Sequence, residues 1–207
     1  MKKKLTLMTL CLLMVLPARA QTRRDERAAR KEAAAAAKQL KRDGYRSLEL
    51  GNMESRLEKY FLKVQAGCSQ VIGTADDCLS TNLAQVTALA NAANSYAMLS
   101  GGEVRARIVS TASSLSGQQV DDIVSSFERL VAKDIRGELV PYVTAVREKR
   151  GHVSTRVYCI VDLDAAYRLR RQALEIALEE QSLATKYGSR ISEWINEGFS
   201  NTQAINE

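Results

Sequence analysis

Few side chains in this sequence have the chemistry of a catalytic centre. His152 is the single histidine among the 207 residues, and nucleophilic catalysis needs a general base that a third group holds in position. His152 stands beside a predicted hairpin turn, where a solvated polar side chain is expected. A hydrolase would require His152 within about 3 Å of Cys159 or of a serine, with an acid behind it. We therefore predict that the protein is not an enzyme and has no catalytic residues.

Adjacent acidic residues are the other candidates for acid–base chemistry. They are Asp76, Asp77, Asp121, Asp122, Asp162, Asp164, Glu179 and Glu180. Neighbouring side chains point to different faces of a helix or strand, and several of these positions suit helix caps. The glycine pair Gly101 and Gly102 lacks the lysine that follows in a phosphate-binding loop. These patterns predict no cofactor.

The cysteines bear on the redox environment and on metal binding. Cys68 and Cys78 flank a short segment, and in an oxidising compartment we predict a disulfide between them, with two unbridged thiols as the alternative. Such a bridge would contribute about 3 kcal/mol at most. Cys159 is expected to be a small buried hydrophobe. With a single histidine and no closely spaced cysteine pair, the sequence predicts no metal site.

The first 20 residues have the pattern of a secretory signal peptide. Lys2–Lys4 form a positive start, residues 5–16 form an apolar stretch, and Ala18 and Ala20 are the small residues that a signal peptidase recognises. We predict cleavage between Ala20 and Gln21. Export would place the mature protein in the periplasm or in association with the outer membrane or cell surface.

The same stretch does not predict a membrane anchor. Its apolar part is too short to span a hydrocarbon core of about 30 Å. Leu10 precedes Cys11, where a lipid-attachment site has a small residue. The mature chain is therefore expected to be soluble and to have no transmembrane segment.

The composition is that of a globular, helix-rich chain with its positive charge near the N-terminus. With 45% hydrophobic residues, 26% charged residues and only two prolines, collagen-like and disordered classes are excluded. The net charge of +6 comprises +4 from the first 20 residues, +5 from residues 21–46 and −3 from residues 47–207. A nucleic-acid binder would more often be basic over a folded face, so nucleic acid is not an expected partner.

Residues 21–46 predict a basic, alanine-rich helical arm. Within it, an exposed helix is expected over residues 22–43, ending at Gly44. A narrow stripe of small side chains recurs at helical spacing: Ala29, Ala33, Ala36 and Leu40. The predicted contact residues are the basic ones: Arg23, Arg24, Arg27, Arg30, Lys31 and Lys38. A solvated surface is one interpretation of this charge, and contact with anionic phosphates of the envelope surface is the other.

The rest of the chain predicts an α+β domain over residues 47–187, followed by a short helix and tail over residues 188–207. Helices are expected near residues 53–65, 80–114, 120–131 and 165–187, and strands near residues 67–74, 139–149 and 153–162. A small antiparallel or mixed sheet of three to four strands, with long helices on one face, accommodates this order. The tail has a cluster of apolar side chains that could dock on the body or bind a partner: Ile191, Trp194, Ile195 and Phe199.

Three stretches together resemble a group of exported bacterial envelope proteins. They are the basic arm of residues 27–45, the apolar strand from Val71 leading into the alanine-periodic helix that reaches Ala97, and the closing strand of residues 153–162. The group is related to the small surface-lipoprotein family whose fold recurs in the amino-terminal domain of flagellar assembly protein T. The resemblance covers residues 25–185 and implies an α+β envelope domain with no cofactor and no catalytic residues. The chain departs from it by lacking a usable lipid-attachment cysteine.

These observations lead to two hypotheses of function. The first is a non-enzymatic exported protein that acts through contacts with an envelope protein or a cell-wall component. The second is a periplasmic carrier or chaperone that binds an apolar ligand between the sheet and the helices. A cavity in the core and a co-purified ligand would distinguish the second from the first.

Overall fold

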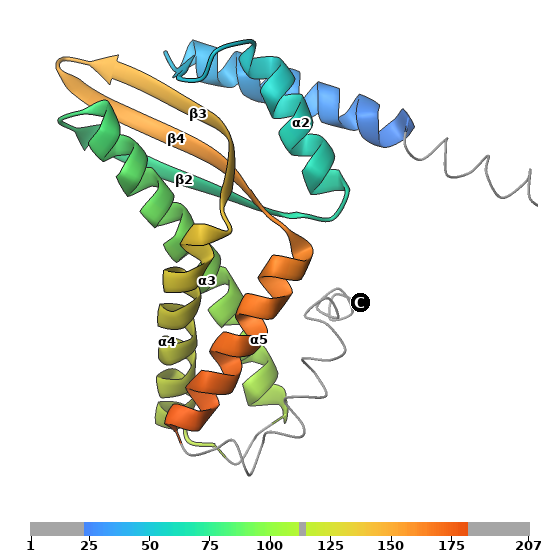
Figure 1. Ribbon diagram of the computed structural model, residues 1–207, viewed down its shortest axis with the longest axis vertical. Coiled ribbons are helices and arrows are strands. Elements are labelled where there is room, and N and C mark those ends of the chain that lie inside the picture. The colour runs from blue at the N-terminus through green and yellow to red at the C-terminus, as the bar shows by residue number, and fades with distance from the viewer. Residues whose placement is uncertain (1–22, 112–114, 182–207) are drawn as a thin grey trace, which may run out of the picture.

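The computed structural model describes residues 23–111 and 115–181, which form an α+β fold (Figure 1). A four-stranded sheet carries helices on both of its faces. In chain order the elements are a first helix (residues 23–42), β1 (Arg46–Ser47), α2 (Met53–Gln65), β2 (Ser69–Cys78), α3 (Thr81–Thr111), α4 (Gly117–Asp134), the 3-10 turn η1 (Ile135–Gly137), β3 (Val140–Lys149), β4 (His152–Val161) and α5 (Leu163–Glu180). The predicted signal peptide, its cleavage site at Ala20 and Gln21, and the predicted helix and tail of residues 188–207 lie outside the described residues.

The sheet has the order β1-β3-β4-β2, and every neighbouring pair of strands is antiparallel. β3 and β4 form the predicted hairpin, in which Lys149 pairs with His152 across Arg150 and Gly151. Both turn residues have a positive φ, 54° and 82°, as a two-residue turn between twisted strands requires. β2 pairs with the other side of β4 and forms an outer edge of the sheet.

β2 is irregular near its end. The register with β4 shifts between Ala75 and Cys78, and Asp77 within this bulge has a φ of 61°. Just before it, the Thr74 carbonyl accepts a hydrogen bond from the side-chain amide of Asn91 in α3, at 2.7 Å. Because a bulge bends its strand and increases the twist, the end of β2 turns away from the line of the ladder.

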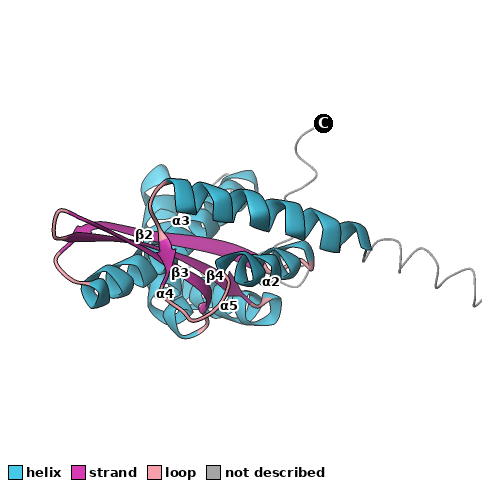
Figure 2. Ribbon diagram, turned by 90° about the horizontal axis from the view of Figure 1, so that it is seen from above, coloured by secondary structure: helices cyan, strands magenta, loops and turns pink. Residues whose placement is uncertain are grey.

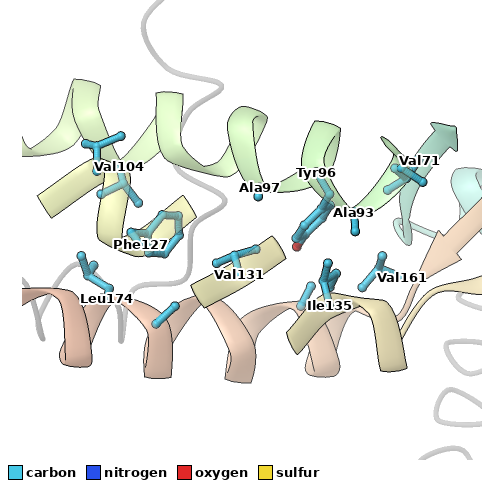
Figure 3. Packing of buried hydrophobic residues seen from close by; sticks show 14 of the residues in the cluster. Val71, Ala93, Tyr96, Ala97, Val104, Phe127, Val131, Ile135, Val161 and Leu174 are labelled. Atoms are coloured by element: carbon cyan, nitrogen blue, oxygen red, sulfur yellow. The ribbon is translucent and has the colours of Figure 1, made fainter. Parts of the chain in front are cut away.

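The first hydrophobic core lies between the sheet and a bundle of α3, α4 and α5. Figure 3 shows Phe127 and Val131 of α4 between the side chains of α3 and Leu174 of α5. Phe127, Val131 and Leu174 are fully buried. α4 begins with a reciprocal cap in which Ser116 and Gln119 bond to each other's backbone N–H groups. The predicted amphipathic helix near residues 120–131 is therefore confirmed.

α3 contacts β2 through very small side chains. Ala88 and Ala92 of the helix face Gly73 of the strand, and all three are buried. A Cβ atom at Gly73 would lie 1.9 Å from the carbonyl oxygen of Ala88 and 2.8 Å from the Cβ of Ala92. The two backbones are therefore in direct contact, with no room for a larger group between them.

The second core lies on the opposite face of the sheet, beneath the first helix and α2, which Figures 1 and 2 show side by side. Ala33, Ala37 and Leu40 of the first helix are at most 2% exposed. They share this core with Val143 of β3 and Tyr158 of β4.

Two expectations change with this second core. We expected helices on one face of the sheet and an exposed first helix, but helices cover both faces and the alanine stripe is buried. The physical reason is that four successive residues of β3 (143–146) and five of β4 (157–161) are buried. Strands with consecutive buried residues need cover on both sides, because neighbouring side chains point to opposite faces.

Candidate functional site: the basic layer over the sheet

The basic side chains of the first helix form one continuous face. The six predicted contact residues, Arg23, Arg24, Arg27, Arg30, Lys31 and Lys38, are all exposed. At 100° per residue they fall within an arc of about 120° on the helix surface. Lys41 and Arg42, which the sequence analysis did not include, fall on the same arc and are also exposed. Helical periodicity applied to the charges, and not only to the alanines, would have found them.

Contacts along its buried side and at the edge of its basic face hold this helix in place. Its buried stripe packs on the sheet, and the Arg30 guanidinium forms an ion pair with Glu58 of α2 at 2.8 Å. The hydrogen bond that Arg30 donates to the Glu58 carboxylate raises the pKa of Arg30. Gly44, with a φ of 83°, ends the helix, and the Tyr45 N–H donates to the Leu40 carbonyl at 2.8 Å. The basic face therefore has a fixed orientation relative to the sheet.

The two helical layers differ in the sign of their charge. Residues 23–65, which contain the first helix and α2, carry twelve Lys and Arg against seven Asp and Glu, a net charge of +5. α3, α4 and α5 together carry seven Lys and Arg against nine Asp and Glu, a net charge of −2. The protein therefore presents a basic layer on one side of the sheet and a mildly acidic one on the other.

A second group of cations lies on the same sheet face as the first helix, close to its C-terminal end. The guanidinium carbons of Arg147 in β3 and Arg156 in β4 each lie 4.9 Å from the ring centroid of Tyr45. Arg147 also donates to the Ser154 hydroxyl at 3.3 Å. This group could not be predicted from the sequence, because its members come from three separate segments and match no motif.

The single histidine lies at the end of the β3–β4 hairpin. His152 Nδ1 is 3.1 Å from an oxygen of Asp77, and both side chains are largely exposed. Cys159 lies seven residues further along β4, about 20 Å away, and is buried. The Ser154 hydroxyl bonds to Arg147. An acid does stand beside the histidine, but the fold does not bring Cys159 to it.

Several of the acidic residues have structural contacts. The Asp162 carboxylate accepts hydrogen bonds from the backbone N–H groups of Asp164 and Ala165. Asp162 is thus the N-cap of α5, as the helix-cap interpretation predicted. Asp121 forms an ion pair with Arg105 of α3. The Glu180 carboxylate accepts hydrogen bonds from Ser126 and Arg129 of α4, and the Ser126 contact lowers the pKa of Glu180. These acids hold helix ends and helix pairs together.

The predicted Cys68–Cys78 disulfide is wrong for this structure. The segment between them is a strand and not a loop, so the two thiols lie at opposite ends of β2, about 30 Å apart. A disulfide needs Cα atoms within about 7 Å of each other. Cys68, Cys78 and Cys159 are all free thiols. Cys159 is buried as expected, and its burial raises its pKa to about 12.

An open groove of about 450 Å³ lies between α2 and the start of β3. It is lined by Leu50, Gly51, Asn52, Ser55, Arg56, Lys59, Val140, Pro141 and Tyr142. Leu50 is 94% exposed, so the groove is on the surface and not between the sheet and a helix layer. In residues 23–111 and 115–181, no three His, Cys, Asp or Glu side chains are grouped so that they could hold a metal ion.

Among the helices of the described part of the chain, none combines the length and the apolar character needed to cross a membrane. Comparisons of the chain with protein families, with curated proteins and with solved structures found no match.

Proposed function

We propose that this is a non-enzymatic, exported envelope protein that binds an anionic partner of the cell envelope through the basic face of its first helix. The observation that supports the proposal most directly is the exposure of all six predicted contact residues on a helix whose other side belongs to a hydrophobic core. A row of cations fixed in this way attracts an anionic surface without a large loss of conformational entropy on binding.

The charge difference between the two helical layers gives such contact a direction. The basic layer would face the anionic surface, and the mildly acidic bundle of α3, α4 and α5 would face away. A solvated helix needs no such segregation, since charges of both signs commonly alternate over exposed faces.

The carrier hypothesis has less support. An apolar ligand between β2 and α3 would have to separate Gly73 from Ala88, whose atoms are already in contact. The groove beside α2 contains the cations Arg56 and Lys59 and is open to solvent.

Charge reversal tests the proposal better than deletion does, because removal of residues 21–43 would also remove part of the second core. The test variant combines Arg27→Glu, Lys31→Glu and Lys38→Glu. A matched control combines Lys133→Glu, Arg136→Glu and Arg168→Glu, three exposed cations of the bundle side. Binding to washed envelope fractions is measured by co-sedimentation at low and physiological salt.

We expect the test variant to lose binding and the control variant to retain it, with weaker binding of the wild type as salt rises. Equal binding by all three proteins would contradict the proposal. Equal melting temperatures of the three proteins would show that the charges, and not the fold, had changed.

A further inference from the structure

Two arginines on the sheet converge on one aromatic ring. In the β3–β4 ladder, Arg147 pairs with Ser154, and Arg156 pairs with Ala145. The two arginines are therefore diagonal neighbours on the same face of the sheet. Each guanidinium carbon lies 4.9 Å from the centroid of the Tyr45 ring, a distance at which cation and π-system attract each other. The two guanidinium carbons are therefore at most about 10 Å apart.

This pair of cations has little negative charge beside it. Among the described residues, Arg147 forms an ion pair with Asp76, at 3.9 Å, and the Asp76 side chain is 68% exposed. Arg156 has no ion pair with any carboxylate in the part of the chain that the structure describes. The Nε atom of Arg147 is buried and has no hydrogen-bond partner. Such an unsatisfied donor costs free energy.

The surroundings hold both arginines in position before any ligand binds. Tyr45 is only 4% exposed, and its backbone N–H bonds to the Leu40 carbonyl. Gly44, with a φ of 83°, brings the chain so close that an added Cβ would lie 3.6 Å from the Arg147 side chain. Arg147 and Arg156 are still partly exposed to solvent. Binding would therefore require little reordering.

We propose that Arg147 and Arg156 form a binding site for a phosphate group. A guanidinium presents its N–H donors as a planar fork that matches two oxygens of a phosphate, and a tetrahedral phosphate can accept from two such forks at once. The group could come from inorganic phosphate or from a phospholipid headgroup. None of the six contact residues of the first helix takes part, so the site does not depend on the proposed function.

Thermal unfolding of the full mature chain tests this site with inorganic phosphate, against chloride at equal ionic strength. Phosphate at about twenty times its dissociation constant should raise the melting temperature of the wild type by about 4 to 7 °C. Arg147→Gln and Arg156→Gln should each weaken phosphate binding about tenfold or more. Arg156→Lys keeps the charge but loses the fork, and should give an intermediate affinity. Lys149→Gln removes one positive charge from the same hairpin and should leave the affinity unchanged.

The source of the phosphate group is distinguished by a second arm of the experiment. Vesicles of phosphatidylglycerol and phosphatidylcholine replace inorganic phosphate, with pure phosphatidylcholine as the blank. If binding to one of these probes is lost when either arginine is replaced, the result supports the site and identifies the source of the phosphate group. Absence of binding to both probes, or equal losses in Lys149→Gln and Arg156→Gln, would overturn it. The Arg27→Glu, Lys31→Glu, Lys38→Glu variant should keep the response to inorganic phosphate, which separates this result from the test of the first helix.

Discussion

Gly73 of β2 lies directly against the carbonyl group of Ala88 in α3, so closely that a Cβ at position 73 would be 1.9 Å from the carbonyl oxygen. This contact sets the distance between the sheet and the longest helix. It explains why the helix presents alanines at this position, since larger side chains would push the two layers apart. The first core depends on this close approach.

Gly73→Ala should destabilise the fold, because the added methyl group overlaps a backbone atom that cannot rotate away. We expect a loss of about 3 kcal/mol or more in the free energy of unfolding. Gly102→Ala is a suitable control, since nothing lies within 4 Å of a Cβ at this exposed helical position. The control should gain about 0.5–1 kcal/mol through helix propensity. Urea unfolding measures both, and equal stability of the two variants would argue against the contact.

Ala33→Glu should detach the first helix from the sheet. Ala33 is 0% exposed in the second core, whereas its neighbour Ala34 points to solvent. A buried, unpaired carboxylate is costly, so we expect a loss of about 3 kcal/mol or more. Ala34→Glu should change stability by less than about 0.5 kcal/mol. Hydrogen exchange of residues 23–42 reports on docking, and equal protection in both variants would show that the helix is not part of the core.

In a chain that begins at Gln21, the thiols of Cys68, Cys78 and Cys159 should differ in reactivity. Cys68 and Cys78 are partly exposed, whereas Cys159 is buried and its raised pKa leaves it protonated at pH 8. Native protein treated with iodoacetamide should therefore gain two labels quickly and a third only in denaturant. Intact mass spectrometry counts the labels. A native mass about 2 Da below that of the reduced chain would instead reveal a disulfide.

Stability should decrease in alkaline solution. Burial raises the pKa of Cys159 from its usual 9.0 to about 12, and burial also raises the pKa of Tyr60 above 10.0. The folded state thus holds these protons more tightly, so their stabilising contribution is complete below pH 9 and is lost as the pH rises towards 12. The decline in unfolding free energy over this range should be less steep in Cys159→Ala and in Tyr60→Phe. An unchanged slope in both would contradict this account.

The exported protein should begin at Gln21. Signal peptidase cleavage after Ala20 would remove Cys11 together with the apolar stretch. Expression of the full gene in a cell with an outer membrane, followed by intact mass measurement of the periplasmic and envelope fractions, tests this directly. Recovery of the whole chain from the cytosol would remove the basis for proposing an envelope partner.

Elements with strong local signals could be predicted from the sequence. The β3–β4 hairpin has β-branched residues on both sides of Arg150 and Gly151, and α4 has apolar residues at regular helical spacing. The α+β class and the end of the first helix at Gly44 follow from similarly local patterns. Such signals act over a few residues, so one sequence is enough to recognise them.

Features that depend on distant partners could not be predicted in the same way. Leu83 and Val86 are large apolar residues at helical spacing, a pattern typical of a buried stripe. They are nevertheless 49% and 59% exposed, whereas Ala84 and Ala88 of the same helix are fully buried. A glycine pair inside a helical pattern is typical of a weak point or bend, yet α3 continues through Gly101, and a Cβ there would overlap Glu128 of α4. The grouping of Tyr45 with two strand arginines is likewise set by tertiary contacts between separate segments.

The irregular end of β2 has a consequence for how the protein behaves at high concentration. An unpaired outer strand invites another chain to add to the sheet, which is a common route to aggregation. Here the bulge at Asp77 bends the strand, two carboxylates stand at that bend, and Asn91 already occupies the Thr74 carbonyl. These features disfavour the addition of a second chain to this end of β2, which is the pairing that leads to fibres.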